Sequence, residues 1–326
     1  MNDLNVAVIL GSIVAGAAPI VLASLGETIS EKAGVINLSL DGSILLSAMV
    51  AFVTAFETKN LLLGFAGGAA AGAVIAGVVG LFSIYLGQSQ VAVGFVLTLT
   101  ARDLAYFFGN PYARQYGPQV IPWPIPGLHE IPLVGQAFFN HGWIVYASML
   151  MIFLCWWYFY RTPQGLRLRM VGEHPEAAYA RGTDSRAVQM TYTVIGGLLV
   201  GLAGAAFSLC VKPGWGRPQG AEGTGWIALA IVIFGGWHPV KVALGAYLFS
   251  FLQVMGIQFQ RWWPSIPAQV FQVAPFPLMI FTLLLLSAAQ RRSGADLDGA
   301  PSILARIVGV LGGAPPRALG KTFSPE

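Results

Sequence analysis

Long apolar runs constrain this chain more than any other feature of its sequence. Leu4 to Leu25, Ala33 to Phe56 and Leu61 to Leu86 follow one another with only short polar connections. Each run has the roughly 20 mostly apolar residues that a helix needs to cross the hydrocarbon core of a membrane. Charged residues make up 10% of the chain, against about 25% in a soluble domain. Because so few charges cannot cover a soluble surface, the sequence predicts an all-α integral membrane protein.

The remaining apolar runs set the expected number of spans. They are Val91 to Phe108, Trp143 to Tyr160, Met190 to Leu209, Gly225 to Trp237, Val240 to Phe259 and Val273 to Ala289. The pattern predicts about nine transmembrane helices, or roughly eight to ten because the shorter runs are ambiguous. We therefore divide the chain into a transmembrane domain, residues 1–292, and a cytoplasmic tail, residues 293–326. Most of this Gly- and Pro-rich tail is expected to be loosely ordered.

The polar segment at residues 161–189 sets the expected orientation. The other long polar segment, Gly109 to Gly142, has Arg114 as its single positive side chain. Since Lys and Arg accumulate in cytoplasmic loops, residues 161–189 are expected in the cytoplasm. Counting spans from there places the N-terminus outside and the connection Gly26 to Lys32 inside. The arginines that carry this argument are Arg161, Arg167, Arg169, Arg181 and Arg186.

The run from Ala33 to Phe56 is interrupted by polar residues in its first half, among them Asn37 and Asp41. A carboxylate in the middle of a membrane helix costs roughly 2.5–3.5 kcal/mol on insertion scales. Such a residue usually faces a bundle interior or a water-filled path. We therefore expect a helix broken at Asp41-Gly42, with Asn37 and Asp41 lining or bordering a polar path. The alternative is that Asp41 only anchors neighbouring helices.

Two further patterns have simpler explanations. Gly64, Gly68 and Gly72 share one helix face, which favours close packing within the chain over an oligomer contact. Arg102 and Asp103 lie near the outer end of their run, where long side chains reach the membrane surface.

Several sequence features argue against other classes of function, although an intramembrane enzyme stays open. The segment Pro315 to Thr322, PPRALGKT, imitates the end of a phosphate-binding loop but has Pro315 where glycine is required. The four histidines lie in separate loops without ligand spacing, so no metal site is expected. No catalytic constellation can be assembled, and the net charge of +4 does not indicate nucleic acid, because arginines mark the inner membrane face. Neither an enzyme nor a bound cofactor is expected.

A short surface helix is predicted inside the arginine-rich loop. Pro175 suits its first turn and Gly182 its end, while Glu173 and Arg181 match the helix dipole. By itself this pattern fits two functions equally well, a structural helix on the membrane surface or a rigid element that docks a motor subunit.

Three segments resemble a known family. They are EKAGVINLSLDG (Glu31 to Gly42), GLRLRMVGEHPEAAYARG (Gly165 to Gly182) and EGTGWIALAIVIFGGWHP (Glu222 to Pro239). In this order they resemble the inner-membrane permeases of ABC importers in the ribose, nucleoside and branched-chain amino acid group. The short N-terminus is similar to that of the nucleoside and simple-sugar branch. Leu38-Ser39-Leu40-Asp41 departs from the family's usual Ile-Gly-Leu-Glu.

The resemblance implies a permease subunit with a type II importer fold in the inner membrane of a bacterium. It would take up a nucleoside or a simple sugar with a separate cytoplasmic ATPase, a second permease (identical or different) and an extracytoplasmic solute-binding protein. The alternative is an autonomous secondary transporter, which would depend on Asp41 or Asp103 as an ion site. The residues implied in ATPase coupling are Gly172, Glu173, Pro175, Glu176, Ala177, Ala178 and Gly182.

Overall fold

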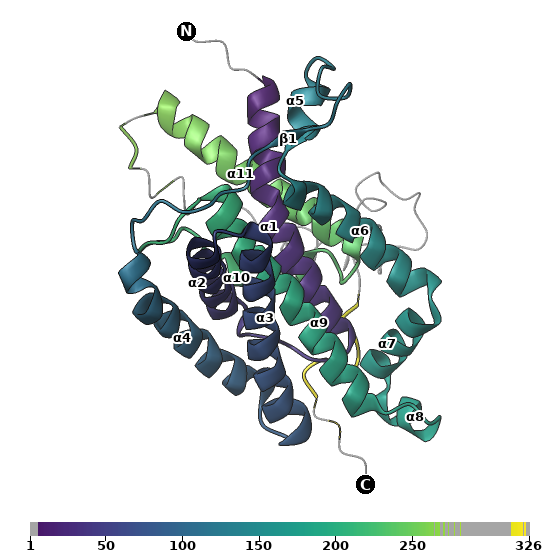
Figure 1. The fold of residues 1–326 in the computed structure, drawn as a ribbon. Coiled ribbons are helices and arrows are strands. Elements are labelled where there is room, and N and C mark those ends of the chain that lie inside the picture. The colour runs from purple at the N-terminus through teal and green to yellow at the C-terminus, as the bar shows by residue number, and fades with distance from the viewer. Residues whose placement is uncertain are drawn as a thin grey trace, which may run out of the picture.

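A computed structural model describes residues 6–263, 265–267, 314–321 and 323, together with the single positions 270, 273, 277 and 281. Among these described residues the regular secondary structure is helical, apart from one pair of two-residue strands (Figure 1). Its main helices are α1 (Val6–Lys32), α2 (Leu40–Thr58), α3 (Leu61–Gly80), α4 (Gln90–Gly109), α6 (Trp143–Arg161), α7 (Pro163–Glu173), α9 (Ser185–Ala206), α10 (Thr224–Phe234) and α11 (Pro239–Trp262). The shorter elements are the π-helical turns η1 (Leu81–Tyr85) and η3 (Phe207–Val211), the 3₁₀ turn η2 (Asn110–Tyr112), β1 (Trp123–Pro124), β2 (Asn140–His141), α5 (Val134–Phe138) and α8 (Pro175–Ala180).

Seven of the described helices are long and apolar enough to cross a membrane. They correspond to the first six predicted runs and to the run at residues 240–259. Helix α10 has 11 residues and is too short to span by itself. The predicted span from Val273 to Ala289 lies outside the described residues, apart from positions 273, 277 and 281. Nine spans are therefore not confirmed.

Helix α1 runs through the middle of the bundle, and α4 lies at its edge (Figure 1). Residues of α1 from Ala17 to Glu31 are buried almost without interruption. Helices α3 and α9 pack at close range because Gly72 of α3 faces the backbone of Gly197 and Gly201, where a Cβ atom would collide. This contact confirms that the glycine stripe of α3 serves packing within the chain.

The chain between α1 and α2 is unwound over residues 33–39. The backbone N–H of Ile36 donates to Gln90 Oε1 at 2.8 Å, and Thr98 Oγ1 donates to the carbonyl of Leu38 at 2.6 Å. Gln90 begins α4 and Thr98 lies eight residues further, so this segment rises roughly 12 Å along α4. Helix α2 thus begins inside the bundle. The predicted break exists, but it ends before Asp41 instead of falling at Asp41-Gly42.

Two ends of the bundle can be distinguished. The α7–α8 end carries these two helices, the end of α1 and the turn between α10 and α11. The opposite end carries the proline-rich segment 113–142 and the connection 212–223. Residues 314–321 and 323 lie against the α7–α8 end, as the contacts below show.

Candidate functional site

The start of α2 meets the start of α10 in the interior of the bundle. Asp41 lies in the first turn of α2, and its Oδ1 accepts a hydrogen bond from the backbone N–H of Gly225 at 3.1 Å. The Asp41 residue is 7% exposed. A helix N-terminus has unpaired N–H groups and a partial positive charge, so a carboxylate is favourable there. Asp41 therefore caps α10 from a helix that begins 184 residues earlier in the chain.

Asn37 organises the unwound segment that leads to this junction. Its backbone N–H donates to Glu27 Oε1 at 2.9 Å. Its side-chain Oδ1 accepts from the N–H of Ser39 at 3.1 Å and from the Ser39 hydroxyl at 2.5 Å. Irregular backbone at membrane depth is tolerated only where such groups are satisfied inside the protein. The two residues predicted to line a path are thus brought into one buried junction, where their described partners are groups of the protein.

Two buried carboxyl groups on α1 support the same region. Glu27 and Glu31 are 0% and 3% exposed, although the sequence predicted residues 26–32 as an inner connection. Glu31 accepts a hydrogen bond from Trp237 Nε1, at the turn between α10 and α11. Glu27 accepts a hydrogen bond from the unwound segment. The two glutamates therefore connect α1 to that segment and to the turn between α10 and α11. Their four-residue spacing at the end of an apolar run, which puts both on one helix face, could have indicated from the sequence that they belong to the helix.

The arginine-rich loop forms two helices, of which only α8 was predicted. Helix α7 begins where the Thr162 hydroxyl accepts from the N–H of Gly165 at 3.0 Å. Gly172 near its end lies against the carbonyl of Lys32, where a Cβ atom would collide. Gly182 follows α8 with φ of +82°, and its N–H donates to the carbonyl of Tyr179 at 2.9 Å. Glycine adopts this left-handed turn without the steric penalty of other residues.

The expected coupling residues differ in what they expose. Pro175 and Ala178 are buried inside this chain, and Ser185 fixes Pro175 by donating to its carbonyl at 2.7 Å. Glu176 and Ala177 are exposed, and so is the neighbouring Tyr179. A partner would therefore meet these three side chains, while Ala178 holds α8 to its own chain.

The last part of the chain packs under the same surface, which the sequence did not predict. The N–H of Ala318 donates to the carbonyl of Gly172 at 3.0 Å, and the N–H of Gly320 donates to the carbonyl of Gly34 at 3.1 Å. The N–H of Arg317 is 3.4 Å from Glu173 Oε2. The rings of Phe323 and Tyr179 lie 5.7 Å apart. Residues 314–321 and 323 thus connect α7, α8 and the unwound segment.

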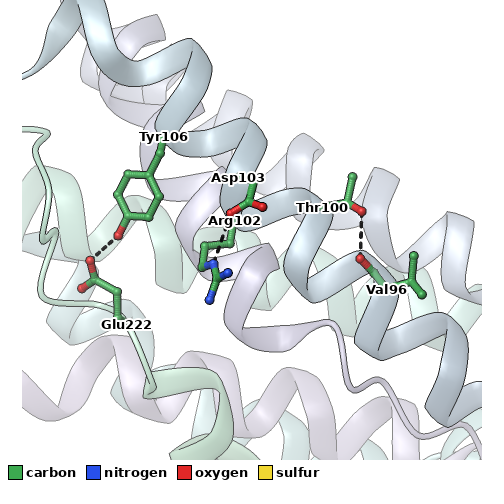
Figure 2. A network of polar contacts seen from close by, with 6 residues as sticks. All are labelled: Val96, Thr100, Arg102, Asp103, Tyr106 and Glu222. Atoms are coloured by element: carbon green, nitrogen blue, oxygen red, sulfur yellow. Dashed lines mark hydrogen bonds and ion pairs between the residues drawn. The ribbon is translucent and has the colours of Figure 1, made fainter.

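Side chains of α4 and of the connection 212–223 form a polar cluster toward the opposite end of the bundle, and Figure 2 shows Tyr106 of α4 meeting Glu222. The Tyr106 hydroxyl donates to Glu222, and Arg217 lies over the Tyr106 ring, 4.7 Å from its centroid. Burial alone would raise the pKa of Glu222, but hydrogen bonds from Tyr106 and from the N–H groups of Gln219 and Gly220 lower it below its usual value.

Arg102 and Asp103 lie on the exposed side of this cluster. Arg102 Nε is 3.4 Å from Asp103 Oδ1, and the side chains are 43% and 73% exposed. An open pocket of about 380 Å³ is lined by Asp103, Tyr106, Phe107, Asn110 and Arg217. Across the part of the chain that the structure describes, no group of three or more His, Cys, Asp or Glu side chains is arranged to hold a metal ion.

The sequence of this chain matches a known protein family. A family model described as the branched-chain amino acid transport system permease component matches residues 9–285. A putative glucose ABC transporter permease of Haloferax volcanii is 38% identical over 77% of this chain and 78% of its own. A guanosine ABC transporter permease of Bacillus subtilis is 31% identical over 88% and 93%, and a nucleoside ABC transporter permease of Lactococcus lactis is 28% identical over 88% and 94%. No solved structure matches.

Proposed function

Because this chain belongs to the family of branched-chain amino acid transport system permease components, we propose that it forms the pathway by which an ABC importer takes up a nucleoside or a simple sugar. The observation that carries this proposal is the match over residues 9–285, together with relatives named as glucose, guanosine and nucleoside permeases. The chain is an ABC transporter permease subunit and a multi-pass membrane protein. Its place in the inner membrane of a bacterium is part of the proposal.

A separate ATPase drives this permease. We propose that it docks on the α7–α8 end, which then faces the cytoplasm in agreement with the arginine asymmetry. Glu176, Ala177 and Tyr179 offer it an exposed helix face. Gly172 and Glu173 connect that face to the end of α1 and to residues 317–318. A rigid connection of this kind transmits movement that a flexible loop would absorb. A second permease and an extracytoplasmic solute-binding protein complete the proposed transporter.

The junction of Asn37, Asp41 and Gly225 borders the proposed path and positions the helices that line it. Its support is geometric: the unwound segment leads from the ATPase-facing end to the shared start of α2 and α10. A shift of α7 against Lys32 would therefore reach these helices through a continuous set of contacts. An importer requires that nucleotide binding stabilise one arrangement of these helices more than another.

Co-expression with an ATPase, a binding protein and a second permease tests the function. The expected result is that the ATPase co-purifies with this chain. Reconstituted vesicles should take up labelled guanosine or glucose only when ATP is present on the side of the membrane where the ATPase docks. ATP-independent uptake that follows an ion gradient would instead establish the secondary transporter. Removal of Asp41 or Asp103 would then abolish the ion dependence.

A further inference from the structure

Helix α4 presents a charged group on a face that no described element covers. Its exposed residues include Val96, Leu99, Asp103 and Phe107, which follow one another at helical spacing. Asp103 is the fourteenth residue of this 20-residue helix, so it lies roughly 20 Å along the helix axis from the first residue of α4. A span of this kind crosses a core about 30 Å thick, and Asp103 is inside the span. The side chain is 73% exposed at that depth.

Lipid does not suit the Asp103 carboxylate on this face. Thr100 on α4 satisfies its hydroxyl by donating to the carbonyl of Val96 at 2.8 Å (Figure 2), so it tolerates an apolar environment. Asp103 has only Arg102 as an ion-pair partner in the described chain, at 3.4 Å. Ionisable side chains within membrane spans usually face a water-filled cavity or another part of the protein. The outer half of α4 is therefore expected to face water.

The pocket beside Asp103 has the chemistry of a site for a hydroxylated ring. Asp103 and Asn110 supply acceptors for hydroxyl groups, and Arg217 supplies donors. Phe107 is 74% exposed and offers aromatic surface to a ring. Tyr106 is held in place by Glu222 on one side and Arg217 over its ring, so the wall of the pocket is preorganised.

Aromatic residues continue from this pocket toward the helix junction. Phe95 lies eight residues before Asp103 on α4, and its ring packs against Trp226 at a tilt of 38°, with centroids 5.4 Å apart. Both side chains are partly exposed. Trp226 follows Gly225, the residue that Asp41 caps. One exposed strip therefore runs from the pocket to the junction between α2 and α10.

We propose that this face of α4 lines the solute pathway and that Asp103, Phe107, Asn110 and Arg217 bind a hydroxylated ring solute, a nucleoside or a sugar, on its way in. The inference rests on the proposed importer function and deepens it by assigning the residues that meet the solute. The family match and the names of the relatives do not select this helix.

Thiol labelling of the assembled transporter in lipid nanodiscs tests the proposal. In a background with Cys155 and Cys210 replaced by alanine, Asp103→Cys and Phe107→Cys are compared with Leu150→Cys. Leu150 is a matched control for position 103: it is 57% exposed and lies seven residues from the first residue of α6, while Asp103 lies six residues from the last residue of α4, at the same end of the bundle. A charged, membrane-impermeant methanethiosulfonate is expected to label positions 103 and 107 at least about tenfold faster than position 150.

Guanosine and glucose, each supplied with the binding protein, serve as probes. One of them is expected to slow labelling at positions 103 and 107, and which one does so identifies the solute class. In the native background, Asp103→Asn is expected to raise the KM for uptake roughly tenfold, because a hydrogen bond to a charged group is lost. The amount of ATPase that co-purifies should not change.

Two results would overturn the assignment. One is labelling at position 103 no faster than at position 150. The other is labelling that neither guanosine nor glucose slows while the same complex takes up one of them. If the ATPase did not co-purify with the unsubstituted permease, the importer function itself would be refuted. A failure of the importer function can therefore be told from a failure of the site assignment.

Discussion

The carboxylate of Asp41 accepts a hydrogen bond from the backbone N–H of Gly225 at 3.1 Å, so the first turn of α2 caps the N-terminus of α10. A Cβ atom at position 225 would collide with the backbone of Asp41, so glycine is required for the approach. Helix α10 is too short to span a membrane alone. Its start inside the bundle is stabilised by this contact.

Asp41→Ala is expected to destabilise the permease because it leaves the N–H of Gly225 unpaired in the interior. The expected loss is roughly 1–3 kcal/mol, while Asp41→Asn retains an acceptor and should lose less. Thermal unfolding of the purified permease in detergent measures both. Ser47→Ala on the same helix is the control, because the Ser47 hydroxyl is buried and has no hydrogen-bond partner among the described residues. Equal stability of Asp41→Ala and Ser47→Ala would contradict a capping role.

Adjacent alanines of α8 should separate docking from folding. Ala177→Trp is expected to reduce co-purification of the ATPase while the unfolding temperature of the permease stays unchanged, because Ala177 is exposed. Ala178→Trp should lower that temperature, since Ala178 is 0% exposed and overpacking a core typically costs about 1–3 kcal/mol. The proposed docking face would be abandoned if Ala177→Trp bound the ATPase as well as the unsubstituted chain.

Deletion of residues 314–326 is expected to weaken coupling and stability together. The carbonyls of Gly172 and Gly34 lose the N–H groups of Ala318 and Gly320, a loss of roughly 1–3 kcal/mol for two backbone hydrogen bonds. Solute-stimulated ATP hydrolysis should fall by more than the amount of assembled complex does. Deletion of residues 324–326 alone is the control. If both deletions behaved alike, the contacts of the tail would have no role in coupling.

The Glu222 carboxylate should make stability depend on acid pH. Its folded-state pKa lies below the usual value of about 4.5, so its contribution is fully present above that value. The contribution is lost as the pH falls from about 4.5 through the lower folded-state pKa. Glu222→Gln is expected to flatten this part of the curve when unfolding temperatures are compared between about pH 7 and pH 4. Glu130→Gln, at an exposed position, should leave the curve unchanged, and an unchanged curve for Glu222→Gln would refute the assignment.

The apolar runs by themselves determined that this is a helical membrane protein, and they located the seven described helices that can span. Hydropathy is summed over neighbouring residues, so α3 or α6 can be recognised without knowing what packs against it. The turn after α8 was predictable for the same reason, since Pro175 and Gly182 act on their own backbone. The family resemblance also depended on short segments that can be compared directly.

Only the tertiary structure decided what the polar residues contact. The sequence could not show that Asp41 meets Gly225, because the two residues lie far apart along the chain. Glu27 and Glu31 looked like parts of a polar connection because their partners, Asn37 and Trp237, lie outside α1. Ala178 could not be told from Ala177, and the tail could not be placed, because burial depends on elements that meet only after folding. Contacts between distant residues leave no mark on local hydropathy, and for that reason the helices were predictable while their junctions were not.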